Sequence, residues 1–115
     1  MKKIYHLSAC STCQRILKEL KPGPEVILQD IKSETMSPSQ VDEMKGLAGS
    51  YEALFSKRAV KYKSFGLKDK NLTEEEMRQW IIEEYTFLKR PVIIIDERIF
   101  VGNSKKVVEA ASHYI

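Results

Sequence analysis

The two cysteines of this chain, Cys10 and Cys13, are separated by two residues near the N-terminus, in the stretch "SACSTC". A cysteine becomes a nucleophile when its surroundings favour the thiolate over the thiol. A second cysteine one helical turn away can attack a sulfenate or mixed disulfide that forms on the first. The spacing therefore favours redox or nucleophilic chemistry at Cys10, with Cys13 as its neighbour.

Two other interpretations of the cysteines are open from the residues alone. Both could be small core residues, because cysteine is among the most buried residue types. They could also be half of a zinc site, which needs four nitrogen or sulfur ligands. The only histidines and cysteines in the chain are His6, Cys10, Cys13 and His113, and His113 lies at the opposite end of the sequence. We therefore expect no metal site.

Cys10 falls between a predicted strand and a predicted helix. The stretch "KKIYHL" (residues 2–7) is short and contains β-formers, which predicts a strand. From Thr12 onward, apolar residues recur at helical spacing, which predicts a helix with Cys13 on its apolar face. Cys10 would then lie at the helix start, where unpaired N–H groups and about half a positive charge favour a thiolate.

Polar residues around Cys10 can assist the thiolate. Ser11 and Thr12 supply hydroxyl donors at the predicted helix start, and Ser8 can join them. His6 is expected to be a strand residue with a satisfied ring nitrogen, and it can also help to hold the thiolate. Ser11, Thr12 and His6 are therefore predicted to be supporting residues of the site.

The ends of the chain predict an α/β fold with a four-stranded mixed sheet. "EVILQDI" (25–31) predicts a second strand, and strand, helix and strand in this order form a βαβ unit with parallel strands. The apolar run "PVIII" (91–95) is suited to a strand covered on both faces. A tight turn, a partner strand "IFV" (99–101) and a final helix within 104–115 complete the order β-α-β … β-β-α.

The middle of the chain is predicted to be helical. Ser37 followed by Pro38 is a favourable helix start, and Thr73 with Glu76 three residues later is typical of a capping box. Residues 51–57 ("YEALFSK") predict a further short helix.

Length and composition indicate one folded domain over residues 1–115. Hydrophobic residues make up 43% and charged residues 30%, and the net charge of +3 predicts no direct nucleic-acid partner. No apolar run approaches the ~18 residues of a membrane span, and the N-terminus lacks the apolar region of a signal peptide. We expect a cytoplasmic protein without a membrane partner or bound cofactor.

Taken in order, these motifs resemble the glutaredoxin-dependent arsenate reductase family, which includes the Spx-like regulators. The resemblance rests on "YH" in the first strand, the turn "ACSTC", the middle stretch "FGLKDKNLTEEEMRQWI" and the late stretch "KRPVIIIDERIFVG". It covers essentially the whole chain. It implies a thioredoxin-like fold with a helical insertion at about residues 32–89.

The resemblance also implies roles for individual residues. It places the nucleophilic cysteine at Cys10, and it matches Arg90 to one of three arginines that hold and polarise an oxyanion. Pro91 matches a cis-proline that faces the cysteine turn. Arsenate reductases of the family usually carry a serine where this chain has Cys13, whereas Spx-like regulators carry a Cys-x-x-Cys switch.

The other two arginine positions of the family differ here. One matches Ser56, which is flanked by Lys57 and Arg58, and the other falls in "VGNSKK", which contains no arginine. A guanidinium offers an oxyanion a fixed bidentate geometry that an ammonium does not. Lys57 and Arg58 are therefore predicted to be supporting, substrate-binding residues.

Two classes of function follow from the resemblance. In the first, a thiol-dependent oxidoreductase, the Cys10 thiolate attacks a small oxyanion or a disulfide, and Arg90 stabilises negative charge. Cys13 or glutathione then resolves the adduct, with glutathione as co-substrate and glutaredoxin as a protein partner. In the second, an Spx-like regulator, a Cys10–Cys13 disulfide changes a surface that binds RNA polymerase.

Overall fold

The computed structural model describes residues 1–115 and separates them into two units. The first unit combines residues 1–35 with residues 90–115, and the second consists of residues 36–89. The first unit thus brings together the two ends of the chain, and the second is the segment between them.

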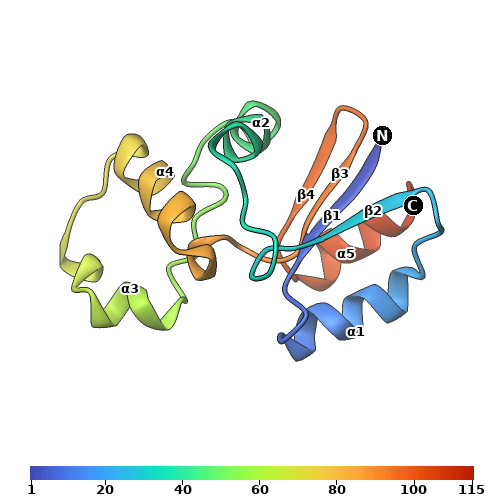
Figure 1. Cartoon of the computed structure of the whole chain (residues 1–115), viewed down its shortest axis with the longest axis horizontal. Helices are drawn as coiled ribbons and strands as arrows, with labels where there is room; N and C mark the ends of the chain where they lie inside the picture. Colours follow the sequence, from blue (N-terminus) through green and yellow to red (C-terminus); the bar gives the residue numbers. More distant parts are fainter. The chain divides into compact units, whose positions relative to one another are not determined.

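The first unit is built on a four-stranded sheet in the order β2-β1-β3-β4. β1 is parallel to β2 and antiparallel to β3, and β3 forms an antiparallel hairpin with β4. The predicted mixed α/β sheet is therefore confirmed (Figure 1). The four strands are β1 (Lys2–His6), β2 (Val26–Asp30), β3 (Val92–Ile95) and β4 (Arg98–Val101).

Two helices of the first unit, α1 (Ser11–Leu20) and α5 (Lys105–Ser112), lie on the same side of this sheet (Figure 1). Their buried residues join those of the strands in one apolar cluster, and burying such side chains is the main force that holds helices on a sheet. All four residues of β3 are buried, as its continuous apolar sequence predicted. The cluster consists of Ile4, Ile16, Leu20, Val26, Ile93, Ile95, Val108 and Ala111.

The second unit is helical, as predicted. Both helix starts with a sequence signal are confirmed, because Ser37 and Thr73 each form a reciprocal capping box with the residue three positions later. None of the helices in the chain has the length and apolar character needed to cross a membrane. The elements of this unit are α2 (Pro38–Ala48), α3 (Val60–Ser64), η1 (Leu67–Asp69), α4 (Glu74–Glu83) and η2 (Tyr85–Phe87).

The short helix predicted over residues 51–57 is wrong. These residues form turns that end in an isolated antiparallel bridge between Phe55 and Leu88. The N–H of Ser56 donates to the carbonyl of Phe87 at 2.7 Å, whereas the N–H groups of Leu54 and Phe55 donate to carbonyls three residues earlier. The stretch therefore consists of turns closed by local bonds and a bridge to a distant segment, and not of a continuous helix.

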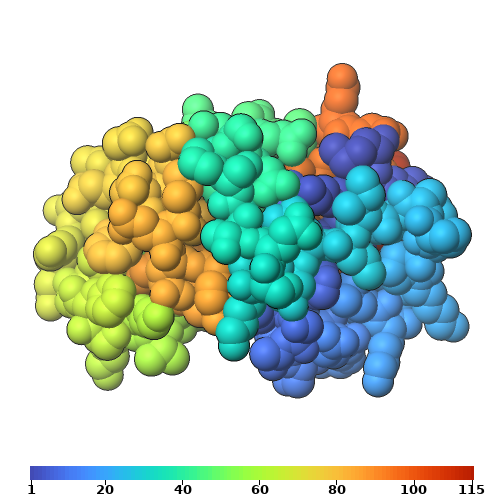
Figure 2. Space-filling model, in the orientation of Figure 1, coloured from blue at the N-terminus to red at the C-terminus, as the bar shows by residue number.

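Aromatic side chains form the centre of the second unit. The rings of Phe55 and Phe87 stack with centroids 5.2 Å apart, and Trp80 meets Phe87 edge-on at 5.6 Å. Phe65 packs on Trp80 at 5.5 Å. Figure 2 shows the yellow-green to orange side chains of α3, α4 and their connection as one continuous surface.

Candidate active site

Cys10 is the N-cap residue of α1, in the turn that follows β1. Its backbone is extended, with φ −93° and ψ 116°. Its N–H donates to the carbonyl of Leu7 at 3.0 Å, and its carbonyl accepts the N–H of Gln14 at 3.1 Å, the first bond of the helix. The side chain of Cys10 therefore begins at the end of α1 where N–H groups lack helical partners.

The surroundings of Cys10 favour its thiolate. Partial burial raises the pKa of this thiol, but four contributions outweigh it and leave the pKa below its usual value of 9.0. These are the backbone N–H and the side chain of Cys13, the backbone N–H of Thr12 and the positive charge of Arg90. The side chain of Cys10 makes no standard N-cap hydrogen bond, but the N–H groups of Thr12 and Cys13 still favour the charged sulfur.

Cys13 lies one turn further along α1 and behaves in the opposite way. Only 1% of its surface is exposed. Burial is the largest cause that raises its pKa to about 11, and the negative charge on Cys10 adds to it. Both thiols are free, so the two sulfurs are neighbours without a disulfide.

Arg90 and Pro91 enter the site at the start of β3. The bond between them is cis, and the carbonyl of Pro91 accepts the N–H of Gly102 at 2.9 Å. Arg90 is half-buried, and its charge lowers the pKa of both Cys10 and Cys13. The first unit thus brings Cys10, Cys13 and Arg90 together from two distant parts of the sequence.

The remaining polar residues of the predicted site take different positions. Ser11 is exposed at the first position of α1, and Thr12 follows it half-buried. His6 is the last residue of β1, is 9% exposed, and has no hydrogen-bond partner at its Nδ1 atom. The predicted satisfied ring nitrogen stays a prediction, because it concerns one of the two ring nitrogens and only Nδ1 is without a partner. The hydroxyl of Ser8 donates to Asp30 and not to the thiolate.

Lys57 and Arg58 belong to the second unit, whereas the cysteines and Arg90 belong to the first. Both residues are exposed in the turn that precedes α3. The Nζ atom of Lys57 lies 3.9 Å from the carboxylate of Glu52, a long and exposed ion pair. Pairs of this kind contribute little to stability.

No group of three or more His, Cys, Asp or Glu side chains is arranged to hold a metal ion. His113 is exposed at the C-cap of α5.

Sequence reasoning missed Asp30, the last residue of β2. Its carboxylate accepts the hydroxyl of Ser8 at 2.5 Å and the N–H of Lys32 at 3.2 Å. The hydroxyl of Ser8 is the largest cause that lowers the pKa of Asp30. A signal was present, because β1 and β2 are parallel and their carboxyl ends meet at the edge where Cys10 follows.

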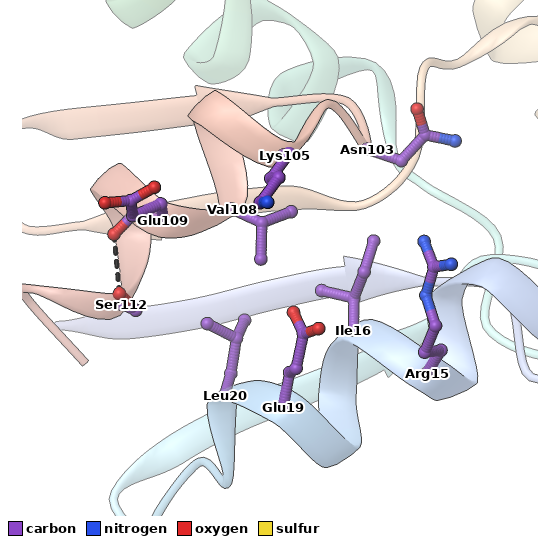
Figure 3. Close-up of a pocket in the computed structure, with 9 residues that line it drawn as sticks. All are labelled: Arg15, Ile16, Glu19, Leu20, Asn103, Lys105, Val108, Glu109 and Ser112. Carbon is purple, nitrogen blue, oxygen red and sulfur yellow. Dashed lines mark hydrogen bonds between the residues drawn. The ribbon is translucent and has the colours of Figure 1, made fainter.

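A groove of about 540 Å³ lies between α1 and α5, separate from the cysteine turn (Figure 3). Its floor is apolar, and charged side chains of both signs stand around it without forming an ion pair with one another. Figure 3 shows Arg15 and Asn103 at one end and Glu109 with Ser112 at the other. The lining residues are Arg15, Ile16, Glu19, Leu20, Asn103, Lys105, Val108, Glu109 and Ser112.

Comparison with known proteins agrees with this fold. The Escherichia coli K12 protein YfgD is 26% identical over 110 residues, and the match covers 92% of each chain. The structure of an arsenate reductase from Vibrio cholerae is similar with a TM-score of 0.79 at 17% identity, covering 99% of this chain and 97% of that one. An arsenate reductase (ArsC) related protein from Brucella melitensis gives 0.74 at 21% identity, covering 95% and 92%.

These two structures share the thioredoxin-like fold with this chain, as the sequence resemblance implied. The model of the ArsC family matches residues 5–111, nearly the full length. The chain therefore belongs to the ArsC family.

Proposed function

We propose that this protein is a thiol-dependent oxidoreductase in which the Cys10 thiolate attacks a small oxyanion or a disulfide. The observation that carries the proposal is the position of Cys10 at the N-cap of α1, half-exposed and with a lowered pKa. A thiolate that is both stabilised and accessible is the form of cysteine that reacts.

The reaction with a disulfide balances with a second thiol as the one further reactant. The Cys10 sulfur forms a bond to one sulfur of the substrate, and the substrate's S–S bond breaks to release a thiolate. A second thiolate then attacks the mixed disulfide, forms a new disulfide and regenerates the Cys10 thiolate. With an oxyanion such as arsenate, two thiols become one disulfide while arsenic accepts two electrons and an oxygen leaves as water.

An external thiol such as glutathione is the better candidate to resolve the adduct. Cys13 is buried, and with a pKa of about 11 only ~10⁻⁴ of it is thiolate at pH 7. Formation of the adduct removes the negative charge from Cys10, which relieves one cause of the raised pKa but leaves the larger one, burial. The thiol of glutathione, free or carried by a glutaredoxin, is not buried in this way.

Arg90 is proposed to stabilise the negative charge that develops at the adduct. Its charge already acts on Cys10, and a guanidinium can donate two parallel hydrogen bonds to an oxyanion. Ser11 and Thr12 lie at the same helix start and are proposed as additional donors. His6 and Pro91, which belong to the same unit as Cys10, are proposed as supporting residues.

An assay panel with the purified, reduced protein tests this function. Arsenate, a glutathione mixed disulfide and a protein disulfide are each supplied with glutathione, glutaredoxin, glutathione reductase and NADPH, and NADPH consumption is followed. We expect turnover of at least one substrate that Cys10→Ser abolishes and Cys13→Ala retains. Equal turnover by wild type and Cys10→Ser would show that the proposal is wrong.

The contact between the two thiols supports a second candidate, a redox-sensing regulator. The Cys13 side chain already acts on the Cys10 sulfur as a hydrogen-bond donor, so a short motion would let an oxidised Cys10 capture it. Binding of purified RNA polymerase to the reduced and the oxidised protein tests this candidate. If the protein is such a regulator, the reduced and oxidised forms should bind RNA polymerase with different affinity, and Cys13→Ala should remove this difference. Identical binding by both forms would exclude the second candidate.

A further inference from the structure

Ser8 stands in the turn between β1 and α1 and is held from two sides. Its hydroxyl donates to Oδ2 of Asp30 at 2.5 Å, which ties the turn to the end of β2. Its carbonyl accepts the side-chain amide of Gln14 at 2.8 Å, which ties the turn to α1. Cys10 follows Ser8 by two residues and lies between Ser8 and Gln14 in the sequence.

Asp30 is also held by hydrogen bonds that do not involve Ser8. Its second carboxylate oxygen, Oδ1, accepts the backbone N–H of Lys32 at 3.2 Å, and its carbonyl accepts the N–H of Glu34 at 2.8 Å. The register of the sheet sets Asp30 opposite His6, the residue with which β1 ends. One carboxylate oxygen therefore orients the side chain while the other holds the cysteine turn.

We propose that Asp30 is a positioning residue for Cys10, which acts through Ser8 to hold the turn that sets Cys10 at the N-cap of α1. The proposal deepens the function proposed above and rests on Cys10 being its nucleophile. The extended backbone of Cys10 directs its side chain toward the N–H groups of Thr12 and Cys13. A turn released from Asp30 would sample other backbone angles, and the thiolate would lose part of this stabilisation.

The carboxylate charge and the hydrogen bond are expected to act on Cys10 in opposite directions, which makes the proposal testable. A negative charge near a thiolate disfavours it, so removal of the charge alone would make Cys10 more reactive. Removal of the hydrogen bond alone would make it less reactive. Asp30→Asn removes the charge and keeps one acceptor oxygen, which can serve the Ser8 hydroxyl but not the N–H of Lys32 as well. Ser8→Ala removes the bond from the hydroxyl but keeps the charge.

The experiment measures the rate of Cys10 alkylation by iodoacetamide against pH, by mass spectrometry on the intact folded protein. We expect Ser8→Ala to slow alkylation at pH 7 by about three- to tenfold and to move the profile to higher pH. Asp30→Ala should slow it less, because this variant removes the charge together with the bond. Asp30→Asn should react at least as fast as wild type, and Ser8→Thr should restore the wild-type profile. Ser112→Ala is the matched control, because that hydroxyl donates to a backbone carbonyl within α5.

Hydrogen exchange at the backbone N–H of Cys10 gives a second readout, independent of activity. This N–H donates to Leu7 across the turn, and it should exchange faster in Ser8→Ala than in wild type. A wild-type alkylation profile in both Ser8→Ala and Asp30→Ala would overturn the proposal, and so would equal slowing in Asp30→Asn and Asp30→Ala. Either result would leave the nucleophilic role of Cys10 intact, since Cys10→Ser tests that role separately.

Discussion

Cys10 and Cys13 lie one turn apart at the start of α1, yet the pKa values of their thiols are shifted in opposite directions. The pKa of Cys10 is lowered, whereas burial raises the pKa of Cys13 to about 11. The helix start is available to the first sulfur and the apolar core encloses the second. The same short stretch thus holds one thiol with a lowered pKa and one with a raised pKa.

The first prediction concerns the order in which the two thiols react. Iodoacetamide at pH 7 should label Cys10 of the native protein and leave Cys13 unlabelled until denaturant is added. Cys13→Ala should raise the pKa of Cys10, because it removes a hydrogen-bond donor to the thiolate, and Cys13→Ser should raise it less. Peptide mapping of the labelled protein against pH measures both effects. Equal labelling of the two native thiols would contradict the assignment.

The second prediction is a loss of stability at high pH. The folded protein holds Cys13 as a neutral thiol with a pKa of about 11, against 9.0 for an ordinary thiol. The stability this contributes is fully present below pH ~9 and is lost as the pH rises toward ~11, because the unfolded chain ionises first. The loss amounts to about 2 kcal/mol. Urea unfolding at pH 8 and pH 11 should show a smaller decrease for Cys13→Ala than for wild type, and equal decreases would rule out this origin.

The third prediction separates the charge of Arg90 from its shape. Arg90→Gln should raise the pKa of Cys10 because it removes a positive charge that stabilises the thiolate. Arg90→Lys keeps the charge and should leave that pKa nearly unchanged, but it loses the bidentate geometry for an oxyanion. Kinetics should therefore show a higher KM for an oxyanion substrate with Arg90→Lys and a shifted pH profile only with Arg90→Gln. A shifted pH profile for Arg90→Lys would contradict this separation.

The sequence predicted the elements whose signals are local. The hydroxyl of Ser37 and that of Thr73 each accept the N–H three residues later. The pair Ser37–Pro38 was enough to locate α2, and Thr73 with Glu76 was enough to locate α4. β-forming residues and an apolar run likewise located strands, and the order of the elements predicted the sheet. The helix start at Cys10 followed from the boundary between two such signals.

Features that depend on distant partners were missed or misplaced. The bridge between Phe55 and Leu88 joins residues far apart in the chain, and nothing near residues 51–57 indicates it. The bond from Ser8 to Asp30 spans 22 positions, so Ser8 was assigned to the thiolate and Asp30 to no role. Propensity describes a segment alone, whereas these contacts exist only once the sheet or the helical unit has assembled.

The fourth prediction concerns the aromatic centre of the second unit. Phe87 is fully buried and stacks on Phe55, so Phe87→Ala should lower the free energy of unfolding by about 3–5 kcal/mol. Phe65 contacts Trp80 and Phe87, but 47% of its surface is exposed. Phe65→Ala is therefore the matched control and should cost clearly less. Urea unfolding followed by Trp80 fluorescence measures both variants, and equal losses would contradict the burial of Phe87 as the cause.

The fifth prediction follows from an ion pair between α2 and α4 within the second unit. Arg78 donates from Nε to Oδ1 of Asp42 at 2.8 Å and from a terminal nitrogen to Oδ2 at 3.2 Å, and the hydroxyl of Tyr51 donates to the same carboxylate. The bond from Arg78 is the largest cause that lowers the pKa of Asp42 to about 2 from 3.8.

Because the folded carboxylate holds its proton less tightly than the unfolded one, the stability from this pair is present above pH ~4. It is lost as the pH falls from ~4 to ~2. Asp42→Asn should therefore be less stable than wild type at pH 7, and the difference should shrink as the pH falls through this window. Glu43→Gln, the neighbouring exposed carboxylate on α2, is the control and should follow wild type at every pH. Circular dichroism during urea unfolding at pH 7, 4 and 2 measures the three proteins. A constant difference between Asp42→Asn and wild type would show that the ionised pair is not its source.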